Sequence, residues 1–146
     1  MASYRTDEDC LFCSIVAGDI PSRTVADTED TLAFLDVNPL APGHTLVIPK
    51  GHHETIAETP TDAMSAVFDT IATLTPAAET AVDADASIVG FNNGRAAGQE
   101  IPHLHGHIVP RFHDDGGHPI HAVAGDRPDL GDDELDSIRD EIVASR

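Results

Sequence analysis

The chain has 146 residues, which suits one domain over residues 1–146 and allows a core without disulfide support. Its 26 acidic residues against 8 basic ones give a formal net charge of −18, and such a surface repels nucleic acid and anionic membranes. No apolar run is long enough to span a membrane, and residues 1–9 are too polar for a signal peptide, so we expect a cytoplasmic protein.

The acidic excess also bears on the host. Lys50 is the only lysine, and the acids are interspersed with regularly spaced apolar residues instead of forming long blocks. This pattern indicates a folded domain with a carboxylate-rich surface, because a disordered acidic chain would lack that spacing. A halophilic host, in which concentrated salt screens the self-repulsion, is the hypothesis that fits best.

The first predicted elements are a short helix and two strands. Residues 10–18 are predicted to form a helix that ends at Gly18. Residues 31–36 and 44–49 are rich in apolar and β-branched residues and are bounded by Pro-containing turns, which predicts strands.

The longest predicted helix begins near residue 59. Thr59 is expected to cap it, and Pro60 suits the first helical position. Apolar side chains then recur at helical spacing and are expected to form one buried face: Met64, Val67, Phe68, Ile71 and Leu74.

Two further strands and a helix complete the prediction. Residues 87–91 and 103–110 read as strands, and residues 112–146 as a solvated loop followed by an amphipathic helix with acids at its N-terminal end. The short strand connections and segregated helices predict an α+β fold: an antiparallel sheet of about five strands, a long helix and a short N-terminal helix.

The segment with the clearest chemistry is His103-Leu104-His105-Gly106-His107. If it is a strand, side chains alternate between faces, so the three imidazoles share one side and form a reactive surface. The alternative is three solvent-facing histidines on an edge strand, which we disfavour because a glycine-rich loop precedes them.

That loop, residues 92–99, carries two glycines and can turn sharply, so its N–H groups could cluster into an anion-binding nest. By itself it would be read as an ordinary connection. Beside imidazoles it suits phosphate, because an imidazole can attack phosphorus while main-chain donors hold the non-bridging oxygens.

From Cys10 to Arg111 the chain resembles the histidine triad (HIT) family, and residues 112–146 lie outside this match. The resemblance rests on an ordered set of stretches and not on the His-x-His pattern alone. They are Leu11-Phe12-Cys13 through Ile20-Pro21, residues 32–36, residues 41–50, Asn92-Asn93-Gly94 with Ala97-Gly98-Gln99, and the triad.

The resemblance implies double displacement on a purine nucleotide conjugate. His105 would attack the α-phosphorus and form a nucleotidyl-histidine that water hydrolyses. His107 would contact the phosphate or leaving group, while His103 and His44 would support the site. The substrates implied are nucleoside phosphoramidates, adenylylated amines or dinucleoside polyphosphates. The phosphate-holding positions correspond to Asn92, Gly98, Gln99 and the N–H groups of Glu100 and Ile101.

The same resemblance places the nucleoside. Asp36 corresponds to the acid that binds the ribose hydroxyls. The apolar slot for the base corresponds to Leu11, Phe12, Ile15, Phe34 and Val37. For Ile15 and Phe34, plain core packing is nearly as good an interpretation.

Cys10-x-x-Cys13 has metal-ligand spacing, although buried inert thiols or a redox pair stay open. Some family members complete such a pair with two histidines, here His52 and His103, which implies a closed structural zinc site. His53 is a rival ligand.

Three residues depart from the family pattern. Gly106 replaces an apolar residue and predicts looser packing, Glu100 replaces a small hydroxyl residue, and Pro102 lacks an N–H.

The resemblance also implies a homodimer. Two other functions stay open, a non-catalytic nucleotide-binding module and a metal-dependent hydrolase using the His-x-His pair. The second is disfavoured because no carboxylate ligand is evident near the triad.

Overall fold

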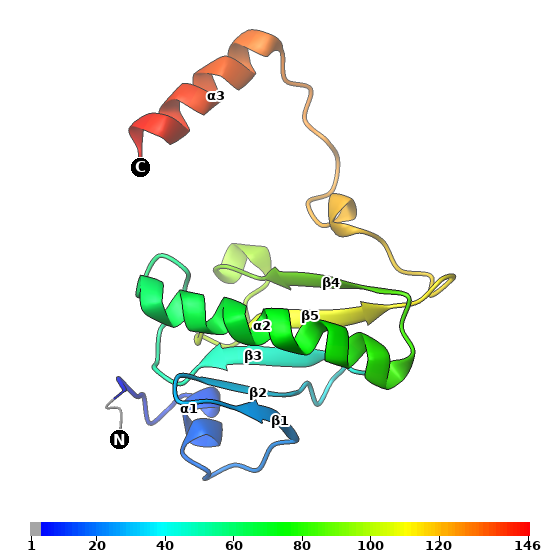
Figure 1. The fold of residues 1–146 in the computed structure, drawn as a ribbon. Helices are drawn as coiled ribbons and strands as arrows, with labels where there is room; N and C mark the ends of the chain where they lie inside the picture. The colour runs from blue at the N-terminus through cyan, green and yellow to red at the C-terminus, as the bar shows by residue number, and fades with distance from the viewer. Residues whose placement is uncertain (1–3) are drawn as a thin grey trace. The chain divides into compact units, whose positions relative to one another are not determined.

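The structure is a computed structural model that describes residues 4–146, and the chain divides into two units at Gly116–Gly117. In the first unit, five antiparallel strands form one sheet in the order β1-β2-β3-β5-β4, and α2 crosses it (Figure 1). The predicted α+β class is confirmed, whereas the single domain over residues 1–146 stays a prediction. The elements of this unit are α1 (Leu11–Val16), β1 (Thr24–Asp27), β2 (Thr31–Leu35), β3 (Thr45–Pro49), α2 (Thr61–Val82), β4 (Ala86–Phe91), a 3₁₀ turn (Arg95–Ala97) and β5 (Gly106–Arg111).

The strand β1 is the element that sequence analysis did not locate. It has four residues, pairs antiparallel with β2, and its register shifts between Thr24 and Ala26. Its side chains are mostly exposed, so it lacks the apolar alternation by which half-buried strands are recognised.

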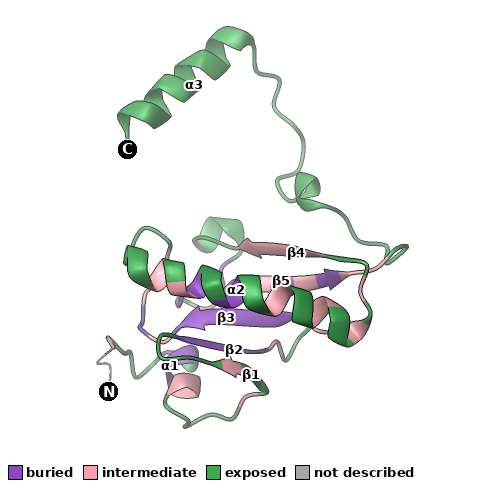
Figure 2. Cartoon of the chain, viewed as in Figure 1, coloured by how far each residue is buried: buried purple, intermediate pink, exposed green. Residues whose placement is uncertain are grey.

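Strands β2 and β3 are buried along nearly their whole length, as Figure 2 shows. One face carries Leu32, Phe34, Leu46 and Ile48, which pack with residues of α1. The opposite face carries Ala33 and Val47, which pack with Val67 and Ile71 of α2. Alternation thus continues along the strands, but both sides are apolar because a helix covers each.

The start and the buried face of α2 differ from the prediction. The N-cap residue is Pro60, and the Thr59 hydroxyl donates to the Thr55 carbonyl (2.7 Å) instead of capping the helix. Val67 and Ile71 are buried as expected, whereas Phe68 is 51% exposed. It lies on the flank of the helix, with its ring centroid 5.7 Å from that of Phe91 on β4.

The triad is not one continuous strand, and this corrects the prediction for residues 103–110. β5 begins at Gly106, so His107 is the only triad histidine within it. Before it the chain turns, because the His103 amide donates to the Ile101 carbonyl (2.8 Å) and the Leu104 amide to the His53 carbonyl (2.6 Å). These bonds replace the strand ladder at His103 and Leu104. The three imidazoles nevertheless share the side of the sheet that α1 covers, as expected, because His103 and His105 both meet the Phe12 ring and His107 is paired with Leu46.

Gly106 does not loosen the sheet, contrary to expectation. A Cβ added there would lie 2.9 Å from both Ile71 Cδ1 and Phe91 Cζ. The space of the missing side chain is therefore already filled by two neighbours. Glycine at this position permits close packing of α2 and β4 against β5.

The second unit, from Gly117, contains a 3₁₀ turn (Ile120–Ala122) and the predicted final helix, α3 (Asp132–Ala144). Three acids occupy the first turn of α3, and the Gly131 amide donates to Glu134 Oε1 (3.5 Å). All its residues are exposed (Figure 2). Among residues 4–146, no helix is long and apolar enough to cross a membrane.

Candidate active site

A cavity of about 520 Å³ opens beside the triad. Its walls come from α1, the β2 end with the loop that follows, and the loop before β5. His44, His105 and His107 line it, whereas His103 does not. The fold thus brings together two triad histidines and His44, and it directs the fully buried His103 elsewhere.

His105 is held as a neutral imidazole with one nitrogen available. Its Nδ1 donates to the His103 carbonyl at 2.7 Å, which leaves Nε2 without a proton in the neutral ring. Burial lowers the pKa of His105, and the carbonyl contact opposes this only in part. A lone pair at Nε2 therefore faces the cavity at neutral pH, as a nucleophile requires.

A chain of hydrogen bonds determines the tautomers of the other two histidines. The Leu40 amide can only donate, so His44 Nδ1 accepts from it (3.0 Å) and the neutral His44 ring carries its proton on Nε2. That proton points to His107 Nδ1 at 2.9 Å. His107 must then carry its own proton on Nε2.

His107 Nε2 is buried and has no hydrogen-bond partner among the described residues. A buried donor without a partner is unfavourable unless a ligand supplies the acceptor. The pKa of His107 is lowered to about 4, chiefly by burial and then by the neighbouring His105 and His44. His107 is thus a neutral N–H donor directed into the site.

The loop before β5 provides donors for an anion. Asn92, Gly98, Glu100 and Ile101 line the cavity. The Glu100 and Ile101 amides make no hydrogen bond within the described chain, so both are available to a ligand. Gly98 has φ +95°, a conformation that other residues rarely adopt, and it makes the turn that presents these amides.

Gln99 is placed differently from the prediction. Its side chain accepts from the Gly94 amide (2.8 Å) and donates to the Glu54 (2.7 Å) and Ile101 (3.0 Å) carbonyls. Its own amide is also used, on the Gly94 carbonyl. Gln99 therefore braces the loop from behind, and its position does not support the expected phosphate contact.

The residues expected to contact the nucleoside do line the cavity: Leu11, Phe12, Ile15, Phe34, Asp36 and Val37. Phe34 belongs to the core as well, whereas Val37 is 78% exposed at the rim. One Asp36 oxygen accepts from the Asn38 amide at 2.8 Å, and the other lies 3.7 Å from His44 Nε2.

Sequence reasoning missed several residues that line this site, among them Arg23 and Leu40. Arg23 lines the cavity two residues beyond the Ile20-Pro21 stretch, and that stretch was the signal available for it. Leu40 contributes through its amide, which no residue pattern reveals because every residue except proline has that group.

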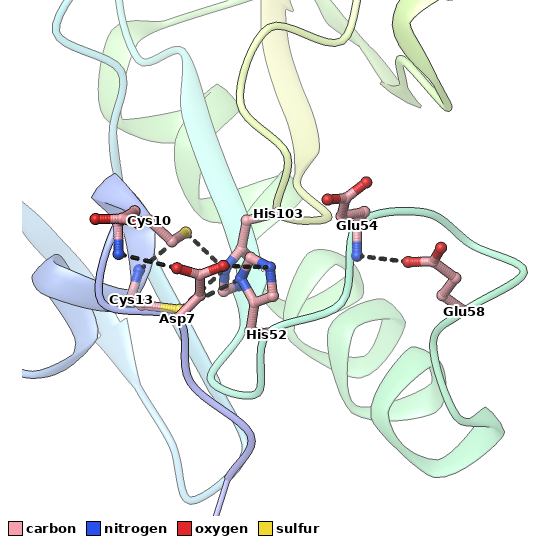
Figure 3. A network of polar contacts seen from close by, with 8 residues as sticks. Asp7, Cys10, Cys13, His52, Glu54, Glu58 and His103 are labelled. Atoms are coloured by element: carbon pink, nitrogen blue, oxygen red, sulfur yellow. Dashed lines mark hydrogen bonds and ion pairs between the residues drawn. The ribbon is translucent and has the colours of Figure 1, made fainter.

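A second cluster lies at the far side of His103 (Figure 3). Cys10 Sγ is 3.4 Å and Cys13 Sγ 3.6 Å from His103 Nδ1, and Cys13 Sγ is 3.5 Å from His52 Nδ1. Zinc bonded at about 2.3 Å to sulfur and about 2 Å to nitrogen would separate tetrahedral ligands by about 3.5 Å. The four buried side chains therefore fit a closed zinc site, and His53 is not among them.

The surroundings of this cluster support metal binding. Burial raises the pKa of the Cys13 thiol to about 11, so this side chain is a neutral thiol without a cation and would lose its proton on binding one. Both histidines present Nδ1 to the sulfurs. Their Nε2 atoms face Pro49 O (2.8 Å, from His103) and Asp7 Oδ2 (3.8 Å, from His52), the kind of outer partners that orient metal-bound imidazoles. The sequence offered no signal for Asp7.

Asp36, His44 and His107 form a third group with the composition of a metal site, so a carboxylate does lie near the triad, contrary to expectation. Its protons argue against metal binding. His44 Nε2 carries a proton because Nδ1 accepts from Leu40, and a protonated nitrogen cannot be a ligand. The hydrogen-bond pattern therefore disfavours a catalytic ion there.

Comparisons with known proteins agree with this geometry. A family model described as the HIT domain matches residues 17–114. An uncharacterized HIT-like protein of Methanocaldococcus jannaschii is 43% identical over 111 residues, 73% of this chain and 82% of that protein. An adenylylsulfatase of Arabidopsis thaliana is 40% identical over 109 residues, 75% of this chain but 55% of that protein. An adenosine 5′-monophosphoramidase of Candida albicans is 35% identical over 115 residues, 76% of this chain and 74% of that protein.

Solved structures show the same fold. A protein of Streptococcus mutans superposes with a TM-score of 0.87 at 37% identity, covering 96% of this chain and 87% of that one. A zinc-bound histidine triad family protein of Mycobacterium smegmatis has a TM-score of 0.71 at 30% identity and covers 94% of this chain and 98% of its own.

Proposed function

Since this chain belongs to the histidine triad family, we propose that it is a nucleotide hydrolase or nucleotidyl transferase that uses His105 as its nucleophile. The observation that carries the proposal is the His105 ring, whose Nδ1–H is committed to the His103 carbonyl while Nε2 faces the cavity. The proposed substrates are purine nucleoside phosphoramidates, adenylylated amines or dinucleoside polyphosphates. The named activities of the Arabidopsis and Candida relatives support this choice.

In the proposed reaction, His105 Nε2 forms a bond to the α-phosphorus, and the leaving group departs with its bonding electron pair and takes a proton from water. The Glu100 and Ile101 amides lie where they can hold the non-bridging oxygens. Water then adds to phosphorus, the bond to His105 breaks, and the water's surplus proton is released. The products are the nucleoside monophosphate and the protonated leaving group.

His107 contributes as a neutral donor in this scheme. Its Nε2–H supplies a hydrogen bond to the phosphate or to the leaving atom as charge develops there. His107 is proposed to keep this proton, because His44 Nδ1 accepts from the Leu40 amide and the chain therefore has no proton to pass on to His107 Nδ1. Asp36 is proposed to accept from the ribose hydroxyls.

Rapid quenching tests this proposal. Wild type mixed with a panel of adenosine and guanosine phosphoramidates and dinucleoside polyphosphates should yield a nucleotidyl-protein, mapped by mass spectrometry to His105. His105→Ala should abolish turnover and the adduct while nucleotide affinity largely remains. Nucleotide binding with no adduct from any substrate would favour the non-catalytic alternative. Turnover that disappears on chelation with the fold intact, and returns with metal, would favour the metal-dependent one.

We also propose that Cys10, Cys13, His52 and His103 hold one structural zinc ion. The donor distances, the burial of all four side chains and the zinc-bound Mycobacterium neighbour support it. Metal analysis of the purified protein should give about one zinc per chain. A metal-free protein of unchanged melting temperature would contradict this assignment.

A homodimer is proposed through α2 and β4. Among the described strands, β4 is at the edge of the sheet, and Phe68 beside it is 51% exposed. A second copy would cover this apolar ring. Light scattering should show a dimer for wild type and a monomer for Phe68→Glu. Val25→Glu, at the opposite sheet edge, should leave the dimer intact, and a monomeric wild type would contradict the proposal.

A further inference from the structure

We infer that the metal held by the Cys/His cluster orients the nucleophile, and that His103 is the positioning residue through which it acts. This rests on the proposed role of His105. The inferred role goes beyond that of a structural zinc ion that only holds the N-terminal helix in place. It makes the alignment of His105 depend on whether a metal is bound to the cluster.

The first connection between the metal and His105 is made by the side chain and the main-chain carbonyl of His103. Its imidazole is anchored at Nδ1 by the two sulfurs (3.4 and 3.6 Å) and at Nε2 by the Pro49 carbonyl (2.8 Å). Its main-chain carbonyl accepts the Nδ1–H of His105 at 2.7 Å. The side chain is fully buried, so its ring cannot change orientation without displacing packed neighbours or its own backbone. A change at the ring is therefore passed to the carbonyl that aligns His105.

The second link runs through α1. Phe12 stands between the two cysteines in the sequence, and its ring meets both histidines edge-on. The ring centroids lie 5.8 Å from His103 and 5.2 Å from His105. A metal bonded to Cys10 and Cys13 fixes the helix that carries this ring. One ion thus constrains two of the contacts that position His105.

Without the metal, these constraints weaken. Thiols are weak hydrogen-bond partners, so the His103 ring would keep only the Pro49 carbonyl as a strong polar contact. Transfer to phosphorus depends mainly on alignment, and a misplacement of about 1 Å can slow such a step by about 100-fold. We expect metal loss to slow nucleotidyl transfer at least about tenfold, within the range seen for supporting residues of metal sites.

His52 is the ligand best suited to a test. It does not line the cavity, and its side chain contacts Cys13, His103 and Asp7. His52→Ala removes one ligand, and His52→Cys restores four ligands as a Cys₃His set. The matched control is His53→Ala, because His53 is adjacent in sequence, lies outside the cluster and supports Leu104 only through its carbonyl.

Three quantities are measured for each variant: the bound metal per chain, the rate of nucleotidyl-His105 formation by rapid quench, and the proton NMR signal of His105 Nδ1–H. The NMR signal is independent of activity. His52→Ala should lose metal, shift or broaden the signal, and form the adduct at least about tenfold more slowly. His52→Cys should restore all three, and His53→Ala should match wild type.

If His52→Ala does not fold, wild type stripped with a chelator and reloaded with Zn²⁺ or Cd²⁺ gives the same comparison. A folded, metal-free protein with an unchanged His105 signal would overturn the inference, because the metal would then serve folding alone. Failure of the proposed function is distinguishable: wild type would form no adduct with any substrate, whether or not the NMR signal follows the metal.

Discussion

Replacing His44 by Phe separates two ways in which this histidine could act. Phenylalanine keeps a ring in a site where His44 is 2% exposed, and it removes the proton donated to His107 Nδ1. His44 lines the cavity, so it could contact substrate itself. The hydrogen-bond chain instead assigns it to holding the tautomer of His107.

The magnitude follows from that assignment. A net hydrogen bond of about 0.5–1.5 kcal/mol favours the Nε2–H tautomer of His107, and about 1.4 kcal/mol corresponds to a factor of ten. His44→Phe should therefore lower kcat by about two- to thirteenfold. His107→Phe removes the donor altogether and should lower kcat by about 10²–10³-fold, as expected for an oxyanion donor.

The assay is kcat with a phosphoramidate substrate for both single variants and the double variant. If His44 acts only through His107, the double variant should be no slower than His107→Phe alone. Nucleotide affinity, measured by calorimetry, should change little in His44→Phe. The reasoning is refuted if His44→Phe is as slow as His107→Phe, or if the two losses multiply in the double variant.

Three other predictions concern stability. The pKa of His107 is about 4 and that of His44 is also lowered, mainly by burial. The unfolded chain therefore binds more protons, and stability that is complete above about pH 6.5 should fall as the pH drops toward 4. Urea unfolding at several pH values between about 4 and 6.5 measures this loss of stability. If the free energy of unfolding falls as steeply with pH in His107→Phe as in wild type, the prediction is contradicted. Gly106→Ala places a Cβ 2.9 Å from Ile71 and Phe91 and should lower the free energy of unfolding by about 1–3 kcal/mol, partly restored by Ile71→Val. An equally stable Gly106→Ala would show that the neighbours can yield. With a net charge of −18, the melting temperature should rise between about 0.1 and 2 M KCl as the Debye length falls to about 3 Å or less, and an unchanged value would remove the halophilic hypothesis.

Local patterns predicted the elements whose signals lie in their own residues. The helical spacing of Val67 and Ile71 identified α2, and the apolar runs around Phe34 and Val47 identified the two buried strands. β1 was not located because its four residues are mostly exposed. The sequence also did not reveal that Phe68 is exposed, because helical periodicity does not say how wide a stripe of the helix surface the sheet will cover.

The candidate site also has features that the sequence predicted and features that only the structure showed. The order of motifs predicted that His105, Asp36 and the loop near Gly98 belong to one nucleotide site, and in the structure all three line one cavity. The sequence could not show that the triad bends before Gly106, because main-chain bonds at His103 and Leu104 produce that bend. It could not show that Gln99 turns away from the cavity either.

The residue types and their order along the chain predicted the fold class and the cysteine pair, and the resemblance they carry singled out His105 as the proposed nucleophile, because those signals lie in side-chain chemistry and in the spacing of motifs. Only the tertiary structure decided which proton each histidine carries, since Leu40, His44 and His107 meet through main-chain and long-range contacts. It alone placed His103 between the two cysteines and His105. The physical reason is that a hydrogen bond or a metal ligand set depends on distances of a few ångströms between segments far apart in the sequence.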